Sequence, residues 1–187
     1  MREAVIVSTA RTPIGKAYRG AFNNTGGVEL ASHAIKAAVA RSGVDPSEIE
    51  DVVFGTGIPE GSTGGKVGQQ GALRAGIPIG VAGMTVARAC SSGLMGVATA
   101  AKHVVDDGMS VVIGGGVESI SLVQTDKQRR DHTGDALLRA KIPQLYISML
   151  ETAEIVAERY NVGREAQDEF ALLSQQRTAQ AQAEGRH

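Results

Sequence analysis

Short apolar runs and amphipathic stretches alternate along the first 120 residues of the chain. The apolar runs are rich in β-branched side chains and end in glycine, proline or polar residues, which is typical of buried strands. Between them, apolar positions recur with a period near 3.6 residues, which predicts helices. We expect strands at residues 4–8, 51–55, 84–87 and 111–113. We expect helices around residues 30–42, 69–75 and 91–105.

This alternation of strand and helix favours an α/β fold, in which helices cover a mostly parallel, mixed sheet. Beyond residue 120 the chain becomes polar, and two further helices are predicted at residues 151–160 and from 164 onward. We therefore expect three parts. They are an α/β domain over 1–120, an excursion over 121–163, and a terminal helix over 164–187.

Two local signals refine the first domain. Gly43 follows the first predicted helix, in the position where a left-handed residue commonly ends one. Asp45 can cap a short helical turn that begins at Pro46, because proline is well tolerated in the first turn. In the third helix, Gly93 and Gly96 would keep the helix thin, while Leu94, Val97, Val104 and Val105 are expected to fill the core.

The charges are nearly balanced, with 19 lysines and arginines against 20 aspartates and glutamates in 187 residues. A net charge of −1 gives no general field for nucleic acid or an anionic membrane, so we expect neither partner. No apolar run approaches the ~18–20 residues of a membrane span, and residues 1–15 lack a signal-peptide pattern. We therefore expect a cytoplasmic protein. The cluster Lys127, Arg129 and Arg130 fits a solvated surface or a site for a phosphate-bearing ligand.

Cys90 is the single cysteine, so no disulfide can form within the chain. It lies where a predicted strand passes into a predicted helix, and the N–H groups of a first helical turn favour thiolate over thiol. Two interpretations stay open, a nucleophile and a buried, inert packing residue.

A nucleophilic cysteine commonly works with a base, and the chain offers four histidines, His33, His103, His132 and His187. His103 lies thirteen residues farther along the same helix, about 20 Å away, which excludes it. His33 is expected on an exposed helix face, and neither His132 nor His187 stands out as the base.

Two glycine-rich stretches, one around Gly55–Gly61 and one at Gly65, miss the spacing of nucleotide-binding motifs. Gly114–Gly116, after a predicted strand, favours close backbone approach. The next residues, Glu118 and Ser119, either line a site or form buried hydrogen bonds. No cluster has the spacing of a metal site, so metal binding is not expected.

The stretch Cys90-Ser91-Ser92-Gly93-Leu94 resembles the nucleophile segment of the thiolase family, the acyl-CoA acetyltransferases and 3-ketoacyl-CoA thiolases. Four other stretches agree and extend the resemblance over almost the whole chain. They are residues 4–15, 53–76, 114–119 and 149–174.

The resemblance implies a thiolase-like layered fold, of which this chain is one of two pseudo-repeated halves. It also implies that Cys90 accepts the acyl group as a thioester and that its backbone N–H contributes to an oxyanion hole. Met149, with Ser148 beside it, would border the acyl pocket. The substrates would be coenzyme A thioesters, with no permanently bound cofactor.

The family's acid–base machinery resides in the C-terminal motifs N-E-A-F, G-H-P-x-G and C-x-G-G-G, none of which occurs in this sequence. The expected function is therefore acyl-CoA:acetyl-CoA C-acyl transfer, by Claisen condensation or thiolytic cleavage, together with a C-terminal half. The isolated chain is expected to be inactive, and a homo-oligomer is expected. The alternatives are a catalytically incomplete subunit that serves assembly and an enzyme like the ketoacyl synthases.

Overall fold

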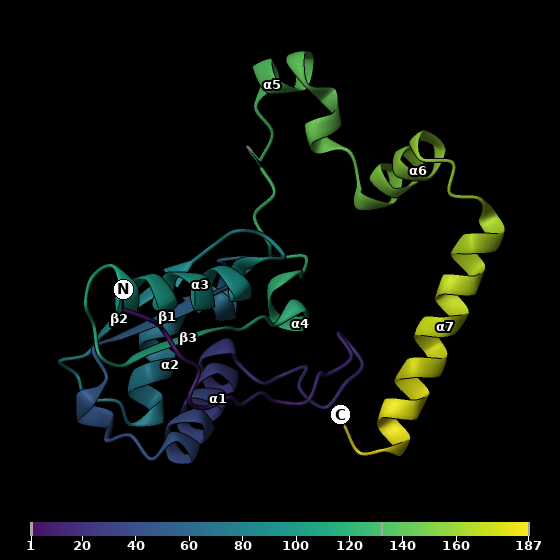
Figure 1. The fold of residues 1–187 in the computed structure, drawn as a ribbon. Coiled ribbons are helices and arrows are strands. Elements are labelled where there is room, and N and C mark those ends of the chain that lie inside the picture. Colours follow the sequence, from purple (N-terminus) through teal and green to yellow (C-terminus); the bar gives the residue numbers. More distant parts are fainter. Residues whose placement is uncertain (1, 132, 187) are drawn as a thin grey trace. The chain divides into compact units, whose positions relative to one another are not determined.

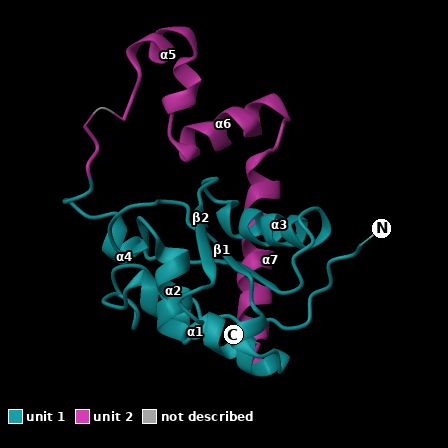
Figure 2. Cartoon of the chain, turned by 90° about the vertical axis from the view of Figure 1, so that its left-hand side faces the viewer, with its two compact units in different colours: residues 1–128 teal, residues 129–187 magenta. Residues whose placement is uncertain are grey.

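The computed structural model describes residues 2–131 and 133–186, and its contacts divide the chain into two compact units (Figure 2). The first unit comprises residues 1–128 and contains the sheet, and the second comprises residues 129–187 and is helical. The division at residues 120 and 163 that the sequence suggests stays a prediction.

Three parallel strands form the sheet of the first unit. They are β1 (Asp51–Gly55), β2 (Ala82–Val86) and β3 (Val112–Gly116), in the spatial order β2-β1-β3. All five residues of the central strand β1 are buried, as its place between two neighbours requires. Strands were expected at all three places, and the structure confirms them with ends shifted by up to three residues.

Helices cover both faces of this sheet, because parallel neighbours need crossover connections. Figure 1 shows α1 (Gly27–Ser42) and α2 (Val67–Ala75) on one side and α3 (Ser92–Val105) on the other. Ile35 of α1 and Phe54 of β1 belong to one buried cluster on the first side. This arrangement confirms the layered α/β fold.

The predicted ends of the first helical segments are also confirmed. Gly43 adopts a left-handed conformation with φ of 70° directly after α1. Asp45 accepts a hydrogen bond from the Ser47 N–H and caps the short 3₁₀ helix η1 (Pro46–Glu48). Hydrogen bonds from the Ser47 hydroxyl and backbone N–H hold the pKa of Asp45 below its usual value.

Glycines allow α3 to lie directly against the sheet. A Cβ atom added at Gly114 would lie 2.8 Å from the Cα of Val97, and one at Gly116 would lie 2.7 Å from the Cα of Gly93. A Cβ atom at Gly96 would collide with the carbonyl oxygen of Gly115. The close backbone approach predicted for Gly114–Gly116 is therefore confirmed.

The expectation that Leu94 and Val97 fill the core is wrong. Leu94 is 73% exposed and Val97 is 38% exposed. The face of α3 toward the sheet contains small residues, including Gly96 and Ala100, which are buried. Leu94 and Val97 therefore point away from the sheet of this unit, whereas Val104 and Val105 are half-buried.

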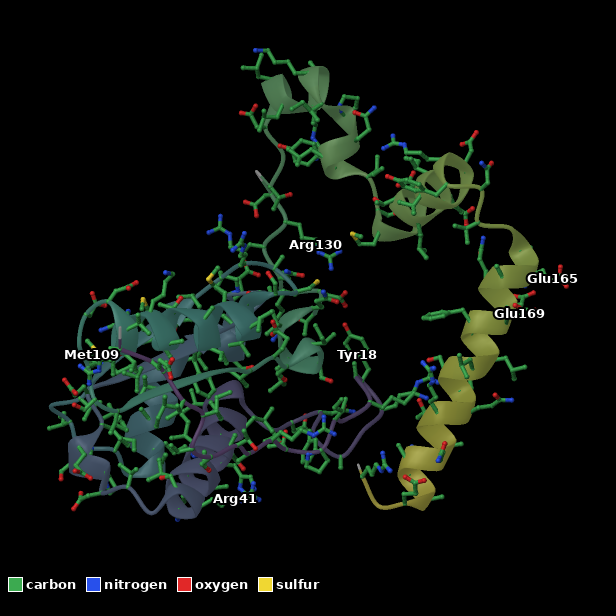
Figure 3. The ribbon with its side chains drawn as sticks, viewed as in Figure 1. Tyr18, Arg41, Met109, Arg130, Glu165 and Glu169 are labelled. Carbon is green, nitrogen blue, oxygen red and sulfur yellow. The ribbon has the colours of Figure 1, made fainter. Side chains whose placement is uncertain are left out.

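The strand expected at residues 4–8 is also wrong, because these residues form no strand. Val5, Ile6 and Val7 are 70–77% exposed. Directly after this segment, Arg41 Nη1 donates a hydrogen bond to the Thr9 carbonyl oxygen at 2.8 Å. Arg41, at the end of α1, is labelled in Figure 3. An apolar run becomes a strand only where a neighbouring strand edge supplies its hydrogen bonds.

A loop around Tyr18 contacts the short helix α4 (Ile120–Val123). The Tyr18 N–H donates to Ser121 Oγ at 2.9 Å, and the Tyr18 hydroxyl donates to the Gln124 carbonyl oxygen at 2.9 Å (Figure 3). Tyr18 has a positive φ of 63°, and these two hydrogen bonds stabilise that conformation. The expected polar excursion therefore begins with an ordered contact.

The second unit consists of helices without buried residues. They are α5 (Ala136–Lys141), the 3₁₀ helix η3 (Pro143–Tyr146), α6 (Met149–Arg159) and α7 (Arg164–Ala183). Both helices predicted for this part of the chain are confirmed. The first begins two residues earlier than expected, because Ser148 caps it directly before Met149. Ser148 forms a capping box with Glu151 in the first turn of the helix.

Candidate active site

The carboxyl ends of the three parallel strands meet at one edge of the sheet. The loop after β1 contains Thr56–Thr63, including the short 3₁₀ helix η2 (Gly61–Thr63). The segment after β2 leads to Cys90, and the segment after β3 contains Glu118. Ligand sites of open α/β sheets lie at this edge. The fold therefore brings two candidate residues, Cys90 and Glu118, to the edge where chemistry is expected.

Cys90 lies on a tight turn between β2 and α3. Ala89, directly before it, has a positive φ of 46°, which is unusual for a residue other than glycine. The hydroxyl of Ser92 accepts a hydrogen bond from the Arg88 N–H at 2.7 Å and donates one to the Ala89 carbonyl oxygen at 2.6 Å. Ser92 is 2% exposed, so its buried hydroxyl stabilises the turn from the inside.

The side chain of Ser91 also stabilises the turn, because its hydroxyl donates a hydrogen bond to the Arg88 carbonyl oxygen at 2.9 Å. Cys90 itself is exposed and forms no disulfide. The interpretation of Cys90 as a buried packing residue is therefore wrong. An exposed thiol at the start of a helix can act as a nucleophile toward a carbonyl carbon.

The carboxylate of Glu118 is engaged by hydrogen bonds from the loop after β1. Its Oε2 accepts from the N–H groups of Gly57 at 3.0 Å and Ile58 at 2.9 Å. Its Oε1 accepts from the Thr63 hydroxyl at 3.1 Å and from the Ser119 N–H at 3.0 Å. Of the two roles left open for Glu118, the structure shows the hydrogen-bonding one.

The candidate bases are distributed away from this edge or fall outside the described part of the chain. His103 Nδ1 lies 3.4 Å from Asp51 Oδ2, without hydrogen-bond geometry, and Asp51 begins β1 at the opposite edge of the sheet. The exclusion of His103 is therefore confirmed. His33 is exposed on α1, as expected. His132 and His187 lie outside the described residues.

The two residues expected near the acyl pocket lie in the second unit, whereas Cys90 lies in the first. Met149, the first residue of α6, is 78% exposed. Ser148 caps α6, because its hydroxyl accepts from the Glu151 N–H at 3.1 Å and its own N–H donates to Glu151 Oε2 at 2.7 Å. Hydrogen bonds from the Ser148 backbone N–H and side chain to the Glu151 carboxylate hold the pKa of Glu151 below its usual value. The role of Met149 and Ser148 in substrate binding stays a prediction.

Residues 2–131 and 133–186 contain neither a group of side chains suited to a metal ion nor a helix suited to a membrane. Within these ranges, no three His, Cys, Asp or Glu side chains gather as a metal site would require. Within the same ranges, no helix is long and apolar enough to cross a membrane.

In the basic cluster of Lys127, Arg129 and Arg130, Arg129 forms an ion pair with Asp131 at 3.1 Å, and both side chains of this pair are exposed.

Sequence reasoning missed the polar residues that support the turn and the loop. Ser92 carries a usable signal, since serine at a helix start commonly forms local hydrogen bonds with the backbone. Thr56 and Thr63 carry none, because their partner Glu118 lies 62 and 55 residues away in the chain. Such pairs follow from the sheet order and not from a local pattern.

The sequence matches a known protein family over almost its whole length. Residues 4–187 match the family model described as "Thiolase, N-terminal domain". A 3-ketoacyl-CoA thiolase of Bacillus subtilis (strain 168) is 39% identical over 186 residues, which cover 100% of this chain and 47% of that protein. An acetyl-CoA acetyltransferase of Cupriavidus necator is 36% identical over 198 residues, covering 100% of this chain and 49% of that protein.

The same relationship holds in three dimensions. The crystal structure of the Bacillus anthracis acetyl-CoA acetyltransferase matches with a TM-score of 0.81 and 35% sequence identity, over 99% of this chain and 49% of that one. The chain spans about half the length of the curated relatives it matches. With its layered α/β fold and a family match over residues 4–187, the chain belongs to the thiolase family.

Proposed function

We propose that Cys90 is the acyl-accepting nucleophile of a thiolase-type acyltransferase, an acyl-CoA:acetyl-CoA C-acyltransferase. The observation that carries the proposal is the exposed thiol on a braced turn before α3, in a chain of the thiolase family. Relatives named 3-ketoacyl-CoA thiolase and acetyl-CoA acetyltransferase support this reaction class.

In the first step the Cys90 thiolate attacks the carbonyl carbon of an acyl-CoA, and the carbonyl electron pair moves to oxygen. The backbone N–H of Cys90 would help to stabilise this oxyanion, and one such donor lowers the barrier by roughly 3 kcal/mol. The carbon–sulfur bond to coenzyme A then breaks, and coenzyme A leaves as a thiolate that takes up a proton. The product is an acyl-Cys90 thioester.

In the condensing direction, the enolate of a second acyl-CoA attacks the thioester, a carbon–carbon bond forms, and the Cys90 thiolate is released. In the degradative direction, the Cys90 thiolate attacks the 3-keto carbon of a 3-ketoacyl-CoA, the C2–C3 bond breaks, and the acetyl-CoA enolate leaves and takes up a proton. The thiol of free coenzyme A then attacks the acyl-Cys90 thioester, forms the shortened acyl-CoA and releases Cys90. Coenzyme A thioesters serve as substrates throughout, and no permanently bound cofactor takes part. Met149 and Ser148 are proposed to border the acyl pocket.

The acid–base groups for the second step are proposed to come from a C-terminal thiolase half, either as a continuation of the chain or as a separate polypeptide. The outer face of α3 supports this, because apolar residues repeat there at helical spacing without cover from the first unit. They are Leu94, Val97 and Ala98. A homo-oligomer and a cytoplasmic location remain part of the proposal.

The test is acylation of Cys90 by acetyl-CoA, followed by intact mass measurement and peptide mapping. We expect one acetyl group on Cys90 in the wild-type protein and none in the isosteric variant Cys90→Ser under the same conditions. Thiolysis of acetoacetyl-CoA is expected only when a C-terminal thiolase half is present. Full turnover by the 187-residue chain alone would contradict the need for that half.

A second candidate function is an assembly subunit that keeps the thiolase surface without catalysis. The exposed apolar face of α3 favours it equally, because that face requires a partner whether or not the thiol reacts. An unlabelled Cys90 in a complex that contains the C-terminal half would support this alternative over the enzymatic one.

A further inference from the structure

Glu118 is separated from the turn that carries Cys90 by the loop after β1, and it accepts hydrogen bonds from that loop. The loop after β1 lies between the segment that follows β2 and the segment that follows β3, because β1 is the central strand. A group that fixes this middle loop can therefore act on the turn that carries Cys90. Glu118 is such a group.

The carboxylate accepts hydrogen bonds from both backbone and side-chain donors of that loop. The Gly57 and Ile58 N–H groups converge on Oε2, and the Thr63 hydroxyl donates to Oε1. The Thr56 hydroxyl adds a longer contact to Oε2 at 3.3 Å. Thr56 and Thr63 are fully buried, so their hydroxyls cannot exchange these bonds for water unless the loop rearranges.

Gly57 links the loop held by Glu118 to the turn that carries Cys90. A Cβ atom added at Gly57 would lie 3.2 Å from the carbonyl oxygen of Ala89 and 3.3 Å from Glu118 Oε2. The backbone of Gly57 therefore fills the space between the Glu118 carboxylate and the residue that precedes Cys90. No side chain larger than hydrogen fits there without displacing one neighbour.

Ala89 is the residue for which such support matters most. Its left-handed backbone with φ of 46° is disfavoured for alanine and persists only when the surroundings hold it. Ser92 holds it from within the turn, through the hydrogen bond from its hydroxyl to the Ala89 carbonyl oxygen. Gly57, anchored by Glu118, packs against the same carbonyl oxygen from outside.

We propose that Glu118 is a positioning residue for Cys90, acting through Gly57 and Ala89 and not by contact with the substrate. The inference deepens the proposed acyl transfer and rests on the role of Cys90 as its nucleophile. Loss of the carboxylate releases the loop after β1, allows the Ala89 turn to relax, and changes the orientation of the Cys90 thiol. The orientation of the Cys90 thiol can be measured without acyl transfer.

The experiment compares Glu118→Gln with Glu50→Gln in the full 187-residue chain. Glu50 is a matched control, because its carboxylate also bridges two segments of the sheet, accepting from the Ser110 N–H at 2.5 Å, but at the opposite edge. Two readouts are used, the rate of Cys90 alkylation by iodoacetamide at fixed pH and the backbone amide NMR signals of Ala89 and Cys90. Neither readout responds merely to a loss of global stability while the protein stays folded.

We expect Glu118→Gln to change the alkylation rate at least threefold and to shift the Ala89 and Cys90 signals. The reason is that the glutamine NH₂ cannot accept the hydrogen bonds that the carboxylate oxygen accepts. Glu50→Gln should change the rate less than threefold and leave both signals in place. A change of less than threefold in Glu118→Gln, with both signals unmoved, overturns the inference.

Gly57→Ala tests the same path without altering the carboxylate and serves if Glu118→Gln does not fold. Its methyl group pushes on the Ala89 carbonyl oxygen and should also shift the Ala89 and Cys90 signals. Gly80→Ala is its control, because a Cβ atom added there meets no atom within 4 Å. Unmoved signals in Gly57→Ala would overturn the inference.

Failure of the inference and failure of the proposed function give different results. If acetyl-CoA does not label Cys90 but alkylation depends on Glu118, the acyl-transfer proposal fails and the positioning role stands. If Cys90 is labelled but Glu118→Gln changes neither readout, the positioning role fails and the function stands.

Discussion

Ser92 joins the two ends of the turn that carries Cys90. Its buried hydroxyl accepts from the Arg88 N–H and donates to the Ala89 carbonyl oxygen, so one side chain satisfies a donor and an acceptor. The left-handed conformation of Ala89 places the carbonyl oxygen where this bond can form. A small polar residue therefore determines the path of the backbone beside the proposed nucleophile.

We expect Ser92→Ala to lower the free energy of unfolding by about 1–3 kcal/mol, because it leaves the Arg88 N–H without its buried acceptor. Chemical denaturation measures the change. Ser91→Ala is the control, since Ser91 is exposed and its hydroxyl makes only one bond, to the Arg88 carbonyl oxygen. Its cost should stay below about 1 kcal/mol. Equal losses in the two variants would contradict a special role for Ser92.

At the scale of the element, α3 depends on glycine for its contact with the sheet. Gly96 faces the carbonyl oxygen of Gly115 so closely that no Cβ atom fits between them. Close packing of this kind positions the start of the helix, and therefore Cys90, over the carboxyl edge of β1. Small residues on α3 thus have a packing role that their low hydrophobicity does not suggest.

We expect Gly96→Ala to lower the free energy of unfolding of the first unit by about 1–3 kcal/mol, because the added methyl group overpacks against the sheet backbone. Gly93→Ala is a matched change on the same helix, where an added Cβ atom meets only the Gly116 Cα at 3.9 Å. Its effect on stability should stay within about 0.5 kcal/mol, because alanine also has the higher helix propensity. Thermal unfolding of both variants measures the difference. A tolerated Gly96→Ala would contradict the packing described for α3.

At the scale of the molecule, two groups stand out among the exposed apolar side chains of the first unit. Leu94 and Val97 lie on the outer face of α3, and Val5, Ile6 and Val7 lie near the N-terminus. A contiguous exposed apolar surface commonly marks an interaction site. Since the chain spans about half the length of its relatives, a C-terminal thiolase half is the partner we propose for the α3 face.

We expect Leu94→Asp to weaken binding of a C-terminal thiolase polypeptide at least tenfold, or about 1.4 kcal/mol, because docking would bury an unpaired carboxylate. Ile79→Asp is the control, because Ile79 is equally apolar and 89% exposed but lies between α2 and β2. Isothermal titration calorimetry measures both affinities, and circular dichroism checks that each variant is folded. Unchanged affinity in Leu94→Asp would place the partner on another face.

Local sequence patterns were sufficient to predict much of the fold. Period and capping signals located the three strands of the sheet, the helices on both faces and the ends at Gly43 and Asp45, because these features depend on neighbouring residues. The placement of Cys90 at the start of a helix followed from the same patterns. The thiolase resemblance, confirmed by the family match, extended this local information to the whole chain.

The tertiary structure alone decided which residues meet. Glu118 binds Gly57 and Thr63 because the sheet order β2-β1-β3 places their loops side by side, although they are 61 and 55 residues apart. Leu94 points outward because glycine occupies the inner face of α3, and residues 4–8 form no strand because no strand edge pairs with them. The sequence by itself determined the elements and the nucleophile candidate. The surroundings of Cys90 were decided by long-range packing, which a local pattern cannot encode.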